Sequence, residues 1–72
     1  MEKMFRLVGL DCANCAAKME RKVNKIKGVE YATVDFMSTK LLLEAKEITE
    51  NMQEDIQKAV QKVDRHVVLQ TI

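Results

Sequence analysis

The feature that most constrains the fold is the change in the spacing of apolar residues along the chain. Short segments in which every second residue is apolar alternate with longer segments in which apolar residues recur every three or four positions. The first spacing is typical of a half-buried strand and the second of an amphipathic helix. From the N-terminus, the spacings predict strand, helix, strand, strand, helix and strand.

Four strands are expected. In the first, Phe5 and Leu7 fall on one face, and in the second Ala32, Val34 and Phe36 do the same. A tight connection between the second and third strands is typical of a hairpin. The predicted strands span residues 3–8, 29–36, 40–45 and 66–71.

Two helices separate these strands. Gly28 follows the first helix and is expected to take the positive φ that often ends a helix. The second helix is expected over residues 50–63, with Thr49 or Asn51 as its N-cap. In the first helix, the predicted apolar face is Ala16, Met19, Val23 and Ile26, and the opposite basic face is Lys18, Arg21, Lys22 and Lys25.

This order predicts a ferredoxin-like βαββαβ fold of the α+β class, in which two helices cover one face of a four-stranded antiparallel sheet. The chain has no proline and only two glycines, so no linker is evident and residues 1–72 are expected to form a single domain. Seventy-two residues leave no room for a catalytic domain with its own substrate pocket. We therefore expect a binding domain and not an enzyme.

Charge and hydropathy exclude several partners. Twelve basic and eleven acidic residues give a formal net charge of +1, which offers no reason to expect nucleic acid or a membrane surface as a partner. The longest apolar runs, such as Leu41 to Leu43, are three residues long, too short for a signal peptide or a membrane span. The expected location is the cytoplasm, where cysteines stay reduced.

The only two cysteines, Cys12 and Cys15, stand at the expected start of the first helix. A helix N-terminus offers unpaired N–H groups and a positive dipole end, both of which lower the pKa of a thiol. Two thiolates at this spacing can converge on one metal ion, as in half of many zinc sites. No second pair is present, so the predicted site is open. Thioredoxin-like redox chemistry is the main alternative, although the chain lacks the tryptophan and proline expected around such a motif.

Residues 9–18 read Gly9-Leu10-Asp11-Cys12-Ala13-Asn14-Cys15-Ala16-Ala17-Lys18. They resemble the loop of the heavy-metal-associated domain, which reads Gly-Met-x-Cys-x-x-Cys. Similarity continues at Gly28, Ala32 and Val34, which resemble the second-strand signature, and at Lys40 in the third strand. It covers about residues 3–71.

The resemblance implies that Cys12 and Cys15 bind a soft metal ion. It also implies docking against a related metal-binding domain or against the core of a P-type ATPase. Family members include modules of ATPases that export zinc(II), cadmium(II) or lead(II), and copper(I) chaperones and copper-ATPase domains. We expect the first class, in which pumping belongs to the rest of the transporter, and retain the copper(I) class as the alternative. The domain is expected to be monomeric, and a dimer in which two loops share one ion is a second arrangement.

Asp11 distinguishes between these branches. Copper members usually carry threonine at this position, whereas aspartate before the first cysteine resembles the zinc, cadmium and lead exporters. A divalent ion needs more ligands and more negative charge than copper(I), and a carboxylate oxygen is acceptable to zinc. Asp11 is therefore predicted as the third ligand. The alternative is that Asp11 only caps the first helix.

The loop that precedes the fourth strand is expected at the same end of the sheet as the cysteines, because that strand runs antiparallel to the first. This places Asp64, Arg65 and His66 near the metal. The glycine and tyrosine usual in copper members are replaced here by Asp64 and Arg65. Arg65 is a candidate to offset the thiolate charge from the outer sphere. His66 is either a fourth zinc ligand or a surface residue that opens the strand.

Overall fold

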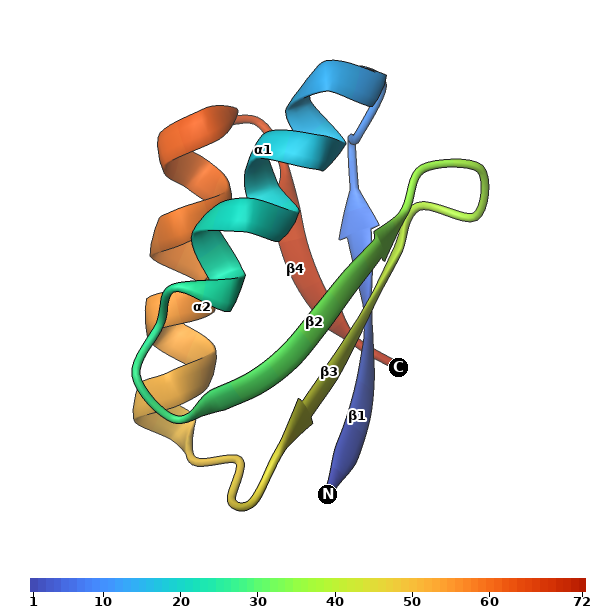
Figure 1. Cartoon of the computed structure of the whole chain (residues 1–72). Coiled ribbons are helices and arrows are strands. Elements are labelled where there is room, and N and C mark those ends of the chain that lie inside the picture. Colours follow the sequence, from blue (N-terminus) through green and yellow to red (C-terminus); the bar gives the residue numbers. More distant parts are fainter.

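The computed structural model describes residues 1–72, and its elements follow the predicted order (Figure 1). The third strand and the second helix have the predicted bounds, and the other three strands differ from their predicted bounds by one or two residues at one end. The elements are β1 (Glu2–Val8), α1 (Ala13–Asn24), β2 (Val29–Asp35), β3 (Lys40–Ala45), α2 (Glu50–Val63) and β4 (Val68–Thr71).

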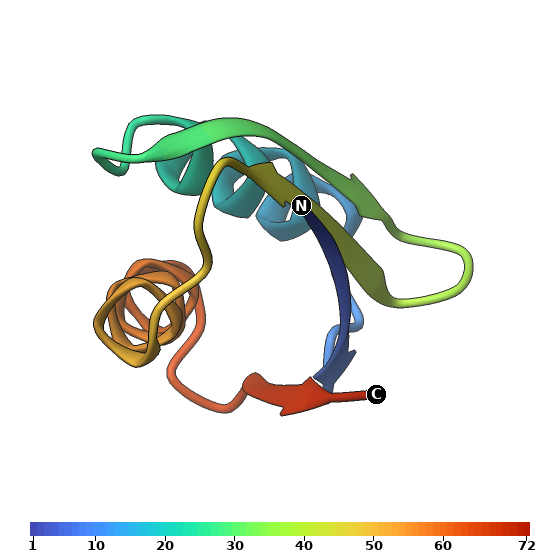
Figure 2. The same ribbon diagram turned by 90° about the horizontal axis from the view of Figure 1, so that it is seen from below.

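The four strands form one antiparallel sheet in the order β2-β3-β1-β4. Seen from below in Figure 2, the sheet curves around the two helices, which lie on the same side of it. The ferredoxin-like prediction is therefore confirmed. Because β1 and β4 are antiparallel neighbours, the end of β1 and the start of β4 lie at the same end of the sheet.

The core lies between the sheet and the helices. Alternate residues of the central strands are fully buried, as the period of two predicts, among them Phe5, Leu7, Leu41 and Leu43. Each such side chain contributes about 1.5–3 kcal/mol relative to an exposed one. The buried helix residues recur at three- and four-residue spacing, which confirms the amphipathic helices. These are Ala16, Met19 and Val23 in α1 and Met52, Ile56 and Val60 in α2.

Two predicted helix ends need correction. Helix α1 ends at Asn24, so Gly28 does not cap it; Gly28 has the expected positive φ of 96° but lies in the turn before β2. For α2, Thr49 and not Asn51 is the N-cap, because the Thr49 hydroxyl accepts a 3.1 Å hydrogen bond from the Met52 N–H. Asn51 is already inside the helix.

Strand β4 starts at Val68, two residues later than predicted. The cause is a turn at Asp64, which receives two backbone hydrogen bonds. The His66 N–H donates to the Asp64 carboxylate at 2.9 Å, and the Val67 N–H donates to the Asp64 carbonyl at 3.1 Å. This turn holds residues 64–67 out of the sheet.

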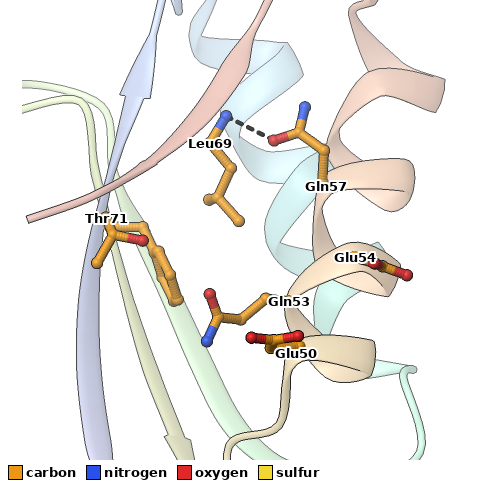
Figure 3. Close-up of a pocket in the computed structure, with 7 residues that line it drawn as sticks. Glu50, Gln53, Glu54, Gln57, Leu69 and Thr71 are labelled. Carbon is orange, nitrogen blue, oxygen red and sulfur yellow. Dashed lines mark hydrogen bonds between the residues drawn. The ribbon is translucent and has the colours of Figure 1, made fainter.

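Helix side chains cover backbone groups of both edge strands. On β2, the Ala32 N–H donates to the Asn24 side chain and the Ala32 carbonyl accepts from it, both at 2.9 Å. The Val34 N–H donates to Glu20 at 2.8 Å. On β4, the Leu69 N–H donates to Gln57 at 2.8 Å (Figure 3). The helices therefore satisfy edge groups that would otherwise be open to another strand.

No helix of the structure has the length and apolar character needed to cross a membrane.

Candidate metal site

The cysteines lie in the connection between β1 and α1, which is fastened to the core at its start. Gly9 has a φ of 93°, a conformation that favours glycine. A Cβ atom there would lie only 3.1 Å from the His66 carbonyl oxygen, so the missing side chain lets this loop pack against the one before β4. Leu10 is buried and anchors the loop in the core.

Helix α1 begins immediately after Cys12, which is its N-cap. The backbone of Cys12 is extended, and its sulfur accepts a 3.3 Å hydrogen bond from the Cys15 N–H. The Ala16 N–H donates to the Cys12 carbonyl at 3.0 Å, the first bond of the helix. The alternative in which Asp11 caps α1 is therefore wrong, because a sulfur occupies the capping position.

The two thiols differ in acidity. The pKa of Cys12 is lowered, first by a hydrogen bond from the Cys15 side chain and then by the Cys15 backbone N–H. The pKa of Cys15 is raised, first because its thiol donates to Cys12 and then because of partial burial and the Cys12 charge. At a pH between the two pKa values, Cys12 is a thiolate, and Cys15 keeps its proton and donates it in a hydrogen bond to the Cys12 sulfur.

Two charged residues act on Cys15 from different elements. The Asp64 carboxylate contributes to the raised pKa of Cys15, and Lys18 acts in the opposite direction. Lys18 lies one helical turn beyond Cys15, and Asp64 follows the last residue of α2. The negative charge of Asp11 opposes the lowering of the Cys12 pKa. The cysteine pair is therefore affected by charged side chains of both signs.

Of the predicted site residues, the structure brings Cys12 and Cys15 into contact, each partly exposed. Asp11, Arg65 and His66 are exposed. The backbone of His66 lies against Gly9, which places the loop before β4 beside the cysteine loop as expected. No three histidine, cysteine, aspartate or glutamate side chains lie close enough together to hold a metal ion.

Two features of the site were not predicted from the sequence. The capping role of Cys12 was not foreseen: the sequence offered Asp11 as a cap only as the alternative to its role as a ligand, because aspartate is the commoner N-cap. Lys18 was placed only on the basic face of the helix, although its spacing of three residues from Cys15 was a usable signal. Asp64 was expected near the site, but its effect on Cys15 depends on how α2 packs.

The cysteine pair does not lie in any of the three surface hollows. The hollow drawn in Figure 3, about 290 Å³ in volume, lies between α2 and β4. The others lie between the two helices and beside the turn before β2. The cysteines are instead on an open surface loop, where two sulfurs can reach an ion that a second molecule or ligand also touches.

The sequence and fold agree with one family of metal-binding domains. The heavy-metal-associated domain family matches residues 4–66, which includes both cysteines and most of the secondary structure. The chain is also similar to the cadmium, zinc and cobalt-transporting ATPase of Bacillus subtilis (strain 168), with 34% identity over 70 residues. That match covers 96% of this chain and 10% of the ATPase, so the chain spans about a tenth of that relative's length.

Two solved structures have the same fold and moderate sequence identity. The N-terminal domain of ZntA in the Zn(II)-form matches with a TM-score of 0.75 and 28% identity, over 97% of this chain and 89% of that one. The N-terminal domain of a potential copper-translocating P-type ATPase from Bacillus subtilis, in the Cu(I)-loaded state, matches with a TM-score of 0.75 and 32% identity. Here 97% of this chain and 84% of that one are covered. With its βαββαβ fold, its surface cysteine pair and a family match over most of its length, this chain belongs to the heavy-metal-associated domain family.

Proposed function

We propose that this domain binds a soft divalent cation, zinc(II), cadmium(II) or lead(II), through Cys12, Cys15 and Asp11. The observation that carries the proposal is the pairing of the two sulfurs at the start of α1, directly after a carboxylate. Two thiolates neutralise the charge of a divalent ion, and Asp11 adds a third ligand. This leaves a coordination position through which a partner can accept the ion.

The geometry of the loop supports a role for Asp11 that is separate from the helix. Asp11 is exposed and outside α1, and the capping position is held by Cys12. Its carboxylate is near enough for its charge to affect the Cys12 pKa. Turning this side chain toward the sulfurs therefore costs no helix cap, and the ion itself offsets the repulsion between carboxylate and thiolate.

The test is the zinc affinity of the reduced protein beside its Asp11→Ala variant, measured by chelator competition at neutral pH. We expect Asp11→Ala to weaken zinc binding tenfold or more, about 1.4 kcal/mol. The matched control is Asp35→Ala, which removes the same charge from the end of β2. Equal zinc affinities for the native protein and Asp11→Ala would refute the ligand assignment.

The second candidate is copper(I) binding, supported by the likeness to the Cu(I)-loaded domain described above. Copper(I) is satisfied by two sulfurs and gains little from a carboxylate. Copper(I) affinity is therefore expected to be the same in the native protein and in Asp11→Ala. If Asp11→Ala changes the affinity for neither metal, the copper(I) hypothesis stands level with the divalent one.

We further propose that the domain is the metal-binding part of a metal-transporting P-type ATPase and passes its ion to the transporter core or to a related domain. The similarity to the ATPase of Bacillus subtilis supports this placement. ATP hydrolysis and transport then belong to other parts of the protein. Transcript sequencing is the check: a reading frame that continues into membrane-spanning segments fits the ATPase, and a stop codon after Ile72 fits a free chaperone.

A further inference from the structure

The outer face of the sheet, opposite the helices, is uncovered in the fold (Figure 2). On β1 and β3 this face carries three consecutive pairs of directly opposed residues. The middle pair is Met4 and Leu42, which is apolar, and Met4 is 41% exposed. The flanking pairs are Glu2 with Glu44 and Arg6 with Lys40.

Each flanking pair places like charges side by side. Glu2 is opposite Glu44, and Arg6 is opposite Lys40. Like charges at directly opposed positions of antiparallel strands are destabilising. Asp35 of β2, opposite Lys40, relieves part of the repulsion in the basic pair, whereas Tyr31 stands opposite Glu44 and brings no charge to the acidic pair. Nothing in the order of the strands required this arrangement.

The three pairs are self-complementary under a twofold rotation. The twofold axis lies in the interface, perpendicular to the strands, along the line that joins Met4 to Leu42. A second copy related by this axis places its acidic pair over the basic pair of the first copy, and its basic pair over the acidic one. Met4 and Leu42 then face their own equivalents. An isologous dimer contact requires this kind of match.

We propose, in place of the monomer expected from the sequence, that this outer face is a docking surface for a second copy of the chain, which forms a weak twofold antiparallel dimer without a metal ion. The partner relieves both like-charge pairs of each copy and covers the apolar row between them. The proposal does not depend on the cysteines, because Cys12 and Cys15 follow the C-terminal end of β1 and belong to none of the three pairs.

The twist of the sheets leaves this match intact. Stacked sheets cross at about 30°, and each charged pair lies two residues, about 7 Å, from the apolar row. The resulting sideways displacement is about 3.5 Å, less than the spacing of about 4.8 Å between neighbouring strands. Long side chains such as Arg6 and Lys40 span this displacement. Since the sheet curves away at both edges, contact is confined to β1 and β3 and the complex is weak.

The experiment uses sedimentation equilibrium and amide chemical shifts of the reduced protein with a metal chelator. The concentration range is about 10 µM to about 1 mM, which covers weak complexes. We expect reversible dimerisation, with shift changes at Met4, Arg6, Leu42 and Glu44. Salt is expected to weaken it, because exposed charges are screened.

Two charge-reversed variants test the symmetry. Arg6→Glu with Lys40→Glu makes the face wholly acidic, and Glu2→Lys with Glu44→Lys makes it wholly basic. We expect each variant alone to self-associate at least about tenfold more weakly than the native chain. Mixing the two variants is expected to restore a dimer about tenfold tighter than the native one, a result that misfolding cannot produce.

The control pair carries the same net charges on other surfaces. Lys22→Glu with Lys25→Glu changes the last turn of α1 and its C-cap, and Glu47→Lys with Glu54→Lys changes the segment before α2 and the helix itself. These variants are expected to keep the native self-association. The proposal is overturned if the protein is a monomer throughout the concentration range, or if it associates only with metal or through another surface. It is also overturned if the mixture of the two face variants associates no more tightly than a mixture of the two control variants.

Discussion

At the scale of single residues, Cys12 and Cys15 have unequal chemistry that follows from their positions in the first turn of α1. Cys12 is the N-cap and receives the Cys15 N–H, so negative charge is favoured on its sulfur. Cys15 donates its proton to that sulfur and lies within the influence of Asp64. A metal ion that binds both sulfurs must displace the proton held by Cys15, so binding is expected to strengthen as pH rises.

The unequal pKa values predict site-selective alkylation of the metal-free protein. A lowered pKa makes Cys12 a thiolate at a pH where a raised pKa keeps Cys15 protonated. Because the thiolate is the nucleophile, Cys12 is expected to react first with iodoacetamide below the ordinary thiol pKa. Fragment-ion mass spectrometry of the singly alkylated peptide locates the modified residue.

The selectivity is expected to fade at high pH, where both sulfurs are ionised. The control is the same reaction in urea, where the helix is lost and the two cysteines should react alike. Preferential labelling of Cys15 in the folded protein at neutral pH would contradict the hydrogen-bond direction described for this pair.

At the scale of elements, α2 depends on its first turn. The Thr49 hydroxyl accepts from the Met52 N–H, and the Gln53 N–H donates to the Thr49 carbonyl. Thr49→Ala is expected to lower the free energy of unfolding by about 1 kcal/mol, because a side-chain cap at a helix start is lost. Urea unfolding followed by circular dichroism measures this change.

Asn51→Ala is the matched control for this prediction. Asn51 is exposed inside the helix, and alanine is the better helix former. Its unfolding free energy is therefore expected to equal or slightly exceed that of the native protein. If Asn51→Ala lowered the free energy of unfolding as much as Thr49→Ala does, Asn51 would contribute as much as Thr49 to the start of the helix.

At the scale of the whole molecule, each helix is tied to the sheet edge beside it by side-chain hydrogen bonds. Asn24 of α1 exchanges two bonds with Ala32 of β2, and Gln57 of α2 binds Leu69 of β4. Only side chains of the right length at these positions can reach the strands. The same bonds protect the edges and fix how the helices lie on the sheet.

Asn24→Ala tests this link. The substitution leaves the Ala32 N–H and carbonyl without their side-chain partner, and we expect a loss of about 1–3 kcal/mol in unfolding free energy. Alanine is the better helix former, but this offsets only a few tenths of a kcal/mol of the loss. Denaturant unfolding measures the change, and light scattering of the folded variant reports pairing of the opened β2 edge.

Arg21→Ala is the control for Asn24→Ala, because Arg21 is exposed on the same helix and makes none of these bonds. It is expected to leave stability unchanged. Asn24→Asp keeps an acceptor for the Ala32 N–H but no donor for its carbonyl, and should fall between the native protein and Asn24→Ala. Equal stability of all four proteins would exclude a structural role for Asn24.

The apolar spacing was enough to predict the order of elements, the bounds of β3 and α2, and the buried faces. It works because the periods of two and 3.6 follow from local backbone geometry. Boundaries were missed where a side chain bonds to nearby backbone. Asp64 delays β4, and Cys12 rather than Asp11 starts α1. These choices depend on competing hydrogen bonds that a spacing pattern does not contain.

The sequence by itself determined the fold class, the cysteine pair at a helix start and the resemblance to a metal-binding family, because each depends on residues close together in the chain. Only the tertiary structure decided which sulfur carries the charge, since this depends on the capping bond and on Asp64 arriving from α2. It also decided which side chains satisfy the sheet edges and which like charges become neighbours. Strand register sets those distances, and register is fixed by packing of the whole core.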